Sequence, residues 1–185
     1  EGGPAGADVE RPDRMPDVSL RHGARLGPKR QARRTDRPMT GHLPPSTGTV
    51  VLDTNVVLDL LLFADPSIAE LVAALQTRQA RWLSTGAMRD ELERVLSYRT
   101  LAAPMAVRGL RPEAMLERFD RSCTLQPVAP ACKVRCSDPD DQPFIDLAVV
   151  HRATLLSKDK AVLRLRRRLE PLAVAVQPVF RLLAT

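Results

Sequence analysis

From Thr49 onward, short apolar runs alternate with segments of helical periodicity. An uninterrupted apolar run such as Val50-Val51-Leu52 is typical of a parallel strand that is buried on both faces. Strands are predicted at 50–52, 81–84, 153–157 and 173–176, helices at 66–75, 86–98, 112–119, 140–152 and 161–169, and a Pro- and Cys-containing loop at 126–139. Strands that alternate with helices predict an α/β fold of three layers around a central, mainly parallel sheet.

The first 48 residues differ in composition from the rest. They hold 7 of the 9 glycines and 7 of the 16 prolines, with nine Arg or Lys and little apolar periodicity. Because such a segment buries too little apolar surface to offset its ordering entropy, we expect a disordered extension over 1–48 and one folded domain over 49–185. The basic run 29–34 is a candidate RNA-contacting arm, although a passive extension is the favoured interpretation, and Met39 is a candidate natural start.

The formal charge is +6, from 28 basic and 22 acidic residues. This excess favours polyanionic partners without selecting nucleic acid, because a solvated Arg-rich surface gives the same balance. The longest apolar run, from Val56 to Ala64, is interrupted at Asp59 and is too short to span a bilayer, and no secretory signal is visible. Three cysteines fit a reducing compartment and lack the second Cys/His pair that structural zinc needs. We therefore expect a cytoplasmic protein with no membrane partner.

Several acidic residues lie at positions from which their side chains can come close together in the fold. Asp53 and Asp159 each follow an apolar strand, and ligands of open parallel sheets bind outside the carboxyl ends of the strands. On the helix predicted at 86–98, Glu91 flanks the apolar face, whereas Asp90 and Glu93 point away from it. We therefore expect Asp53, Glu91 and Asp159 to face the same edge of the sheet.

Asp141 is the fourth candidate. It falls within the apolar stripe of the helix predicted at 140–152, near its start, because Pro143 lacks an amide hydrogen and must belong to the first turn. Asp138 and Asp140 are near enough in sequence to take its place. Each acid alone also has a structural explanation: an Asp after a strand caps the next helix, Glu91 can pair with a neighbouring arginine, and the helix dipole favours an acid at a helix start.

Together, these four carboxylates need a counter-charge, for which a divalent metal ion is the favoured candidate. Without the ion, their repulsion should raise some of the pKa values. Mg²⁺ or Mn²⁺ would bind one or two carboxylates directly and keep several waters. The acids therefore predict metal-dependent phosphodiester chemistry. The sequence has no Gly-rich phosphate loop, which disfavours nucleotide binding of the P-loop or Rossmann kind.

With these residues assembled, the chain resembles the PIN-domain family of ribonucleases over about residues 49 to 180. Residues 51–55 (Val-Leu-Asp-Thr-Asn) are similar to the family's opening strand and first acid, and residues 90–96 to its second acidic motif. Residues 138–144 resemble the third motif and residues 156–159 the fourth, so that order and spacing both match. Asp146 is a departure, since relatives more often carry a small residue there, and we expect it only to add surface charge.

The resemblance implies one or two Mg²⁺ or Mn²⁺ ions and endonucleolytic RNA cleavage that leaves a 5′-phosphate and a 3′-hydroxyl. Asp53 and Asp141 are the expected principal ligands, with Glu91 and Asp159 as ligands through water or as groups that orient a water. Asn55 and Ser157 are candidates for hydrogen bonds that hold those carboxylates or the scissile phosphate. The candidate RNA contacts are cations close in sequence to the acids: Arg89, Arg94, Lys158 and Lys160.

The similarity is to bacterial toxins of toxin–antitoxin operons in particular, which implies a cognate antitoxin and a homodimer. Apolar surface for a dimer is expected on the segments 66–75 and 112–119. Two alternatives stay open: a PIN-fold module that binds RNA or protein without catalysis, and another metal-dependent phosphoryl hydrolase. A haloacid-dehalogenase-like enzyme would need an Asp two residues after Asp53, where Asn55 stands.

Overall fold

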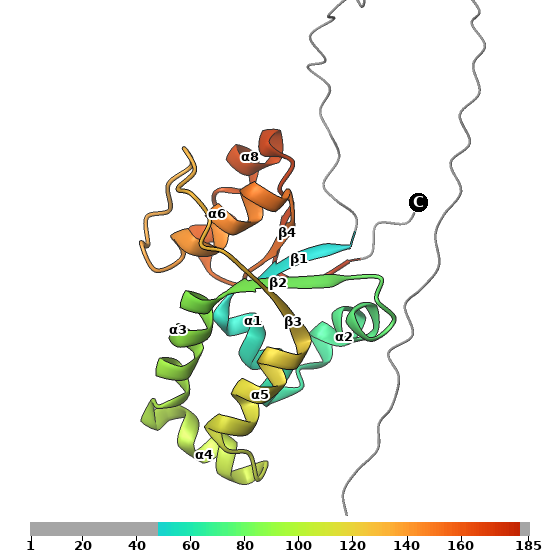
Figure 1. The fold of residues 1–185 in the computed structure, drawn as a ribbon, viewed down its shortest axis with the longest axis vertical. Coiled ribbons are helices and arrows are strands. Elements are labelled where there is room, and N and C mark those ends of the chain that lie inside the picture. The colour runs from blue at the N-terminus through green and yellow to red at the C-terminus, as the bar shows by residue number, and fades with distance from the viewer. Residues whose placement is uncertain (1–47, 182–185) are drawn as a thin grey trace, which may run out of the picture. The chain divides into compact units, whose positions relative to one another are not determined.

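The computed structural model describes residues 48–181 and shows a five-stranded, all-parallel sheet with helices on both faces (Figure 1). The strand order is β3-β2-β1-β4-β5. The strands are β1 (Thr49–Leu52), β2 (Arg81–Thr85), β3 (Cys123–Gln126), β4 (Thr154–Leu156) and β5 (Val176–Gln177). The α-helices are α1 (Thr54–Leu58), α2 (Ala69–Gln76), α3 (Gly86–Leu96), α4 (Arg99–Val107), α5 (Pro112–Ser122), α6 (Gln142–His151), α7 (Lys160–Leu163) and α8 (Arg166–Leu169). The predicted three-layer α/β fold is confirmed.

Three short turns complete the secondary structure: a π-helical turn η1 (Asp59–Phe63) and two 3₁₀ turns, η2 (Pro66–Ile68) and η3 (Glu170–Leu172). The extension predicted over 1–48, with its basic run 29–34 and Met39, lies outside the described residues except for Gly48. Within residues 48–181, no helix combines the length and the apolar character needed to cross a bilayer.

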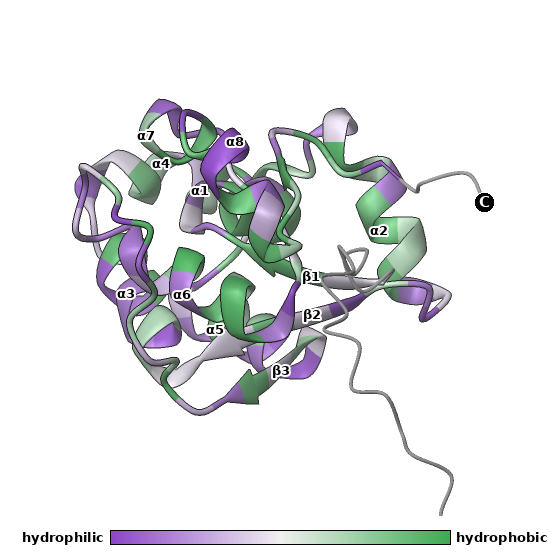
Figure 2. Cartoon of the chain, turned by 90° about the horizontal axis from the view of Figure 1, so that it is seen from above, coloured by the Kyte–Doolittle hydropathy of each residue, from purple (hydrophilic) through white to green (hydrophobic). Residues whose placement is uncertain are grey.

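The apolar side chains of the central strand divide the core into two halves. Val50 and Leu52 point to the face covered by α1, α2, α4 and α5, whereas Val51 points to the face covered by α6, α7 and α8. Successive side chains of a strand point to opposite faces, so a wholly apolar strand must be covered on both sides. In Figure 2 the hydrophobic colour is clear on α2, whereas α8 is mainly hydrophilic.

Some predicted elements differ from the structure. The last strand begins at Val176 rather than at 173, because Ala173, the residue after η3, has a positive φ of 60° that interrupts an extended conformation. The basic segment 161–169 forms two short helices instead of one, with a tight hydrogen bond from Leu165 N to Val162 O at the break. Strand β3 and the helices α1 and α4 were not predicted.

The topology creates one edge where ligand groups can gather. From β1, the sheet continues to β2 on one side and to β4 on the other. The Asp53 amide donates to the Leu156 carbonyl at 3.0 Å, so the ends of β1 and β4 lie side by side. In open α/β sheets, the crevice for a ligand lies at such a reversal of strand order, outside the carboxyl ends.

Candidate active site

Asp53 is the buried acid at the end of β1. It caps α1, because its Oδ1 accepts a hydrogen bond from the Val56 amide at 2.9 Å. Its side chain is 3% exposed, and Oδ2 has no hydrogen-bond partner among the described residues. Burial raises the pKa of Asp53, although the Ser157 hydroxyl and the amides of Val56 and Lys158 lie near enough to lower it in part. A buried oxygen without a donor is costly, and a cation would satisfy it.

Ser157 stands between two of the candidate acids. It is fully buried just after β4, and its Oγ accepts a hydrogen bond from the Asp159 amide at 3.0 Å. Its hydroxyl also lowers the pKa of Asp53. Asp159 in turn caps α7 by accepting from the Ala161 amide. The capping explanation therefore holds for both Asp53 and Asp159, and it leaves Oδ2 of Asp53 unused.

Glu91 lies half-buried on α3 and faces the start of α1. Its Oε1 accepts a hydrogen bond from the Thr54 hydroxyl at 3.1 Å. Burial raises the pKa of Glu91, and the charges of Asp140 and Asp53 add to this, while Thr54 and Arg94 oppose it. Thr54 was missed in the sequence, although its place directly after Asp53 could have indicated it.

Asp141 lies half-buried at the start of α6. The pKa of its carboxyl is raised from 3.8 to about 6, first by burial and then by the negative charges of Asp159, Asp138, Asp53 and Glu91. Its side chain makes no capping hydrogen bond, so capping does not explain this acid. The two alternatives are exposed, and Asp138 accepts a hydrogen bond from the Asp140 amide at 3.0 Å.

A cavity of about 340 Å³ brings three of the four acids together. Asp53, Glu91 and Asp141 line it, with Thr54 and Asn55 beside them and apolar side chains of α1, α3, α4 and α6 as its wall. Asp159 does not line this cavity, although its charge raises the pKa values of Asp53 and Asp141. Asp140 instead lines a neighbouring hollow of about 370 Å³ with Glu91 and Arg94.

The carboxylates fit a hydrated divalent cation. In the part of the chain that the structure covers, no three His, Cys, Asp or Glu side chains are close enough to enclose an ion by themselves. Mg²⁺ does not require such a cage, since it commonly binds one or two carboxylates and keeps its other waters. A cation would satisfy the unpartnered Oδ2 of Asp53 and would offset the negative charges around Asp141.

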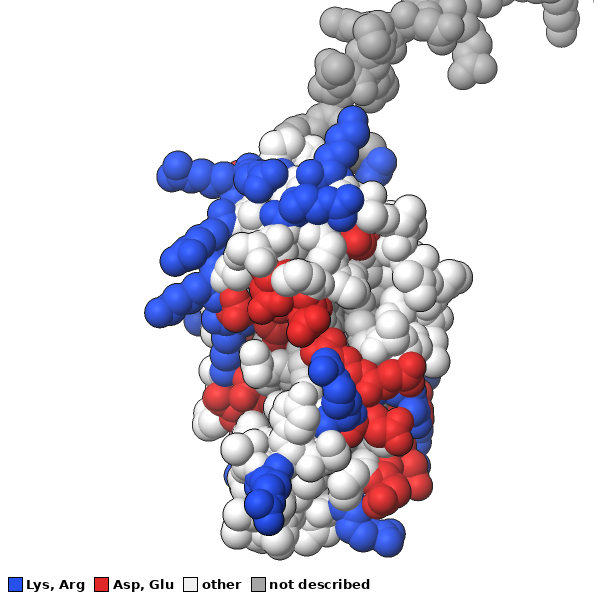
Figure 3. All heavy atoms as spheres, turned by 90° about the vertical axis from the view of Figure 1, so that its left-hand side faces the viewer, with Lys and Arg blue, Asp and Glu red and all other residues white. Residues whose placement is uncertain are grey.

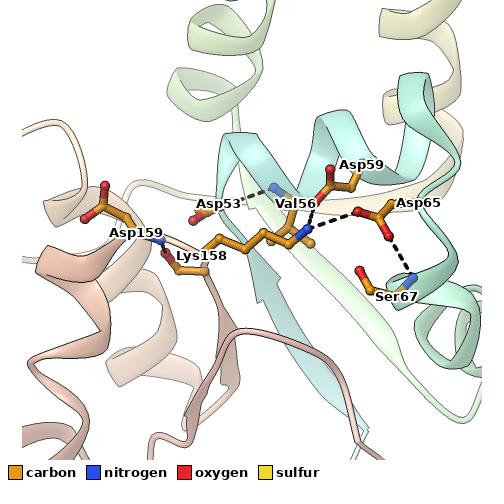
Figure 4. A network of polar contacts seen from close by, with 8 residues as sticks. Asp53, Val56, Asp59, Asp65, Ser67, Lys158 and Asp159 are labelled. Carbon is orange, nitrogen blue, oxygen red and sulfur yellow. Dashed lines mark hydrogen bonds and ion pairs between the residues drawn. The ribbon is translucent and has the colours of Figure 1, made fainter.

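Two of the four predicted RNA-contacting cations are engaged within the protein. Lys158 extends away from Asp159 to Asp59 and Asp65, at 2.6 and 3.3 Å from their carboxylates (Figure 4). The Arg89 guanidinium binds both carboxylate oxygens of Asp120, at 2.7 and 3.0 Å. The other two, Arg94 and Lys160, are exposed.

The prediction that Asp146 only adds surface charge was wrong. Asp146 is 7% exposed, and its Oδ1 accepts hydrogen bonds from the Cys132 amide and from Gln142 Nε2, each at 2.8 Å. Gln142 also accepts from the Cys136 amide at 2.9 Å and donates to the Val134 carbonyl at 3.1 Å. Asp146 and Gln142 therefore hold the 126–139 loop against α6, next to Asp141.

The raised pKa of Asp141 gives a pH prediction for the metal-free protein. The folded state keeps this proton up to about pH 6, whereas the unfolded chain releases it near 3.8, so the associated stability is lost as pH rises through about 6. In EDTA, the Tm of the wild type relative to Asp141→Asn should fall between about pH 4 and pH 7. Thermal melts check this, and a Tm difference that does not change with pH would contradict it.

Comparison with known proteins identifies the domain. A family model described as PIN domain matches residues 49–161, which is more than half of the chain and includes all four candidate acids. Strand β5 lies beyond the matched residues. No curated protein matches the chain with significant similarity.

Proposed function

Because the chain belongs to the PIN-domain family, which has a nuclease-type fold, we propose that it is a Mg²⁺- or Mn²⁺-dependent endoribonuclease. One observation supports this above all: Asp53, Glu91 and Asp141 line one cavity at the carboxyl ends of the central strands. Burial, and after it the neighbouring negative charges, raise the pKa of Asp141 to about 6. Carboxylates held in this state suit an ion that binds together with a phosphate.

The position of each residue indicates its role in the proposed reaction. Asp53 and Asp141 would hold the ion, since both line the cavity and Asp53 has a buried oxygen to spare. When bound, the ion supplies an acidified water and neutralises charge on the phosphate. Ser157 orients Asp53 and Asp159, and Thr54 orients Glu91. These hydrogen bonds keep the carboxylates in place before RNA arrives.

The direct test is cleavage of a single-stranded RNA of mixed sequence by the purified chain. We expect cleavage with Mn²⁺ or Mg²⁺, none in EDTA, and products that carry a 5′-phosphate and a 3′-hydroxyl, identified by mass spectrometry. The matched control is Asp90→Asn, which changes an exposed acid on the same helix as Glu91 and should cleave at the wild-type rate. Cleavage that persists in EDTA, or none with either ion, would contradict the proposal.

The proposed activity in the cell is that of a toxin. Cleavage of cellular RNA stops growth, so induced expression in a bacterial host should arrest growth, and Asp141→Asn should not. Asp138→Asn serves as the control, because Asp138 is an exposed acid of the same loop outside the cavity. The measurement is colony formation after induction, with protein levels matched by immunoblot. Arrest by the Asp141→Asn variant would count against RNA cleavage as its cause.

The proposal includes an antitoxin that binds the protein and a homodimer of the chain. A hollow of about 400 Å³ lies between η1, α2 and the end of α5, and most of its lining is apolar: Leu60, Leu61, Val72 and Leu75. Val72 and Leu75 belong to the segment 66–75 that was predicted to offer apolar surface for a dimer, whereas no lining residue belongs to the segment 112–119. The acidic cavity would suit an antitoxin that presents a basic side chain.

A further inference from the structure

An RNA strand that approaches the carboxylates meets repulsion, because its phosphates carry the same charge. A bound divalent ion cancels only part of that charge, so further cations must hold the strand. Arg89 and Lys158, two of the cations nearest to the acids in sequence, are already paired with Asp120, Asp59 and Asp65. Of the four predicted cations, only Arg94 beside Glu91 and Lys160 at the start of α7 are left, so most of the positive charge for RNA must come from further along the surface.

The segment 160–168 carries the densest positive charge in the described part of the chain. Five of its nine residues are cations and none is an acid: Lys160, Arg164, Arg166, Arg167 and Arg168. All five are exposed. Arg166 donates from Nε to the Val176 carbonyl at 3.0 Å and so fastens α8 to β5. Within residues 48–181, the other four form no hydrogen bond or ion pair through their side chains, and we name these four the basic ridge.

The basic ridge starts beside the candidate site. Asp159 caps α7, and Lys160 is the first residue of that helix. Arg164 follows five residues after Asp159, which corresponds to about 7.5 Å along a helix axis. Stacked nucleotides of one strand advance about 3.4 Å each, so this is the length of roughly two nucleotides. In Figure 3, basic side chains gather at one end of the face and an acidic patch lies next to them.

We propose that the basic ridge, Lys160, Arg164, Arg167 and Arg168, binds backbone phosphates of single-stranded RNA and leads the strand to the cavity of Asp53, Glu91 and Asp141. This inference rests on the proposed ribonuclease function and names the surface by which that site receives its substrate. The contacts are electrostatic and independent of base sequence. Base stacking does not contribute on the ridge itself, because residues 160–168 include no aromatic side chain.

The surroundings of the basic ridge favour RNA over a lipid surface. A helix that lies on a membrane inserts an apolar face between the headgroups. On α7 and α8 the apolar side chains are already used, since Val162, Leu165 and Leu169 are buried in the core. An extended anionic surface would also lie against the acidic patch next to the basic side chains and would be repelled by it (Figure 3).

The test measures binding without cleavage. A fluorescein-labelled single-stranded RNA is titrated with the full chain in EDTA, and anisotropy gives Kd at several salt concentrations between about 50 and 200 mM. The ridge variant combines Arg164→Gln, Arg167→Gln and Arg168→Gln. The control variant combines Arg78→Gln, Arg81→Gln and Arg118→Gln, three exposed arginines on other elements, and it has the same net charge. Circular dichroism melts establish that both variants fold.

The ridge variant should bind RNA about 10- to 100-fold more weakly than the wild type near 0.1 M salt. The slope of log K against log salt should become shallower by about 2, because each phosphate contact on a single strand contributes roughly 0.7. The control variant should lose less than half as much slope. Equal losses in the two variants would show an effect of net charge alone and would overturn the proposal, as would an unchanged slope in the ridge variant.

Two further measurements distinguish RNA binding by the basic ridge from membrane binding and from RNA cleavage. Vesicles with phosphatidylserine replace RNA in the same titration, and a ridge variant that loses vesicle binding but keeps RNA binding would overturn the proposal in favour of a membrane. Because binding is measured without metal, its outcome does not depend on catalysis. A protein that binds RNA through the ridge but cleaves none with Mn²⁺ would refute the ribonuclease and leave the RNA surface standing.

Discussion

Asp53→Asn should lower the rate of metal-dependent RNA cleavage by about 1,000-fold or more. Polarisation by a metal ion is worth several kcal/mol, and each 1.4 kcal/mol changes a rate about tenfold. The substitution leaves the geometry almost unchanged: the retained carbonyl oxygen can still accept from the Val56 amide, while the amide group replaces Oδ2. Single-turnover cleavage with saturating Mn²⁺ measures the effect.

The same variant should fold at least as stably as the wild type when metal is absent. Burial raises the pKa of Asp53, which means that its charged form is disfavoured in the folded protein, and Asn removes that charge. In EDTA at neutral pH, the Tm of Asp53→Asn should equal or exceed that of the wild type. Addition of Mn²⁺ should raise the wild-type Tm more than the variant's. A variant that is both inactive and unfolded would leave no case for Asp53 as a ligand.

Asp146→Ala should lower the free energy of unfolding by about 2–4 kcal/mol. The change removes the acceptor of two hydrogen bonds and leaves the Cys132 amide and Gln142 Nε2 without it, and each unsatisfied buried group costs about 1–3 kcal/mol. Urea denaturation at neutral pH measures the loss.

Two controls make this prediction specific. Asp146→Asn keeps an oxygen that can accept both hydrogen bonds, so it should cost clearly less than Asp146→Ala. Asp90→Ala removes an exposed acid and should stay within about 0.5 kcal/mol of the wild type. If Asp146→Ala were as mild as Asp90→Ala, the loop 126–139 would not depend on Asp146 for its attachment.

The sequence was most informative where a strand is buried on both faces. The strands β1 and β4 were predicted near their observed bounds, because full burial requires an apolar run that is visible in the sequence. Strand β3 lies at the edge of the sheet, and its Thr124 and Leu125 are exposed, so no such run marks it. Helix α4 contains Pro104, which conceals its helical pattern.

For the site, the sequence predicts on which strand or helix each acid lies, but it does not predict which distant segment packs over that acid. The strand-end rule and helical periodicity brought Asp53, Glu91 and Asp141 to one edge, where the structure has them around one cavity. Asp146 points away from the apolar stripe of its helix, yet the 126–139 loop covers it, and helical periodicity carries no information about a distant loop. The pairing of Lys158 with Asp65, 93 positions away, is equally invisible in a local pattern.

The central position of β1 in the sheet has a consequence for folding during synthesis. This first strand needs β4 as a neighbour, and β4 is synthesised about a hundred residues later. Pairing over such a separation is slow and costs loop entropy before any contact rewards it. The acids arise from segments that stretch from Asp53 to Asp159, so a nascent chain still on the ribosome holds them apart. The four acids can thus come together only when translation of the domain is nearly finished.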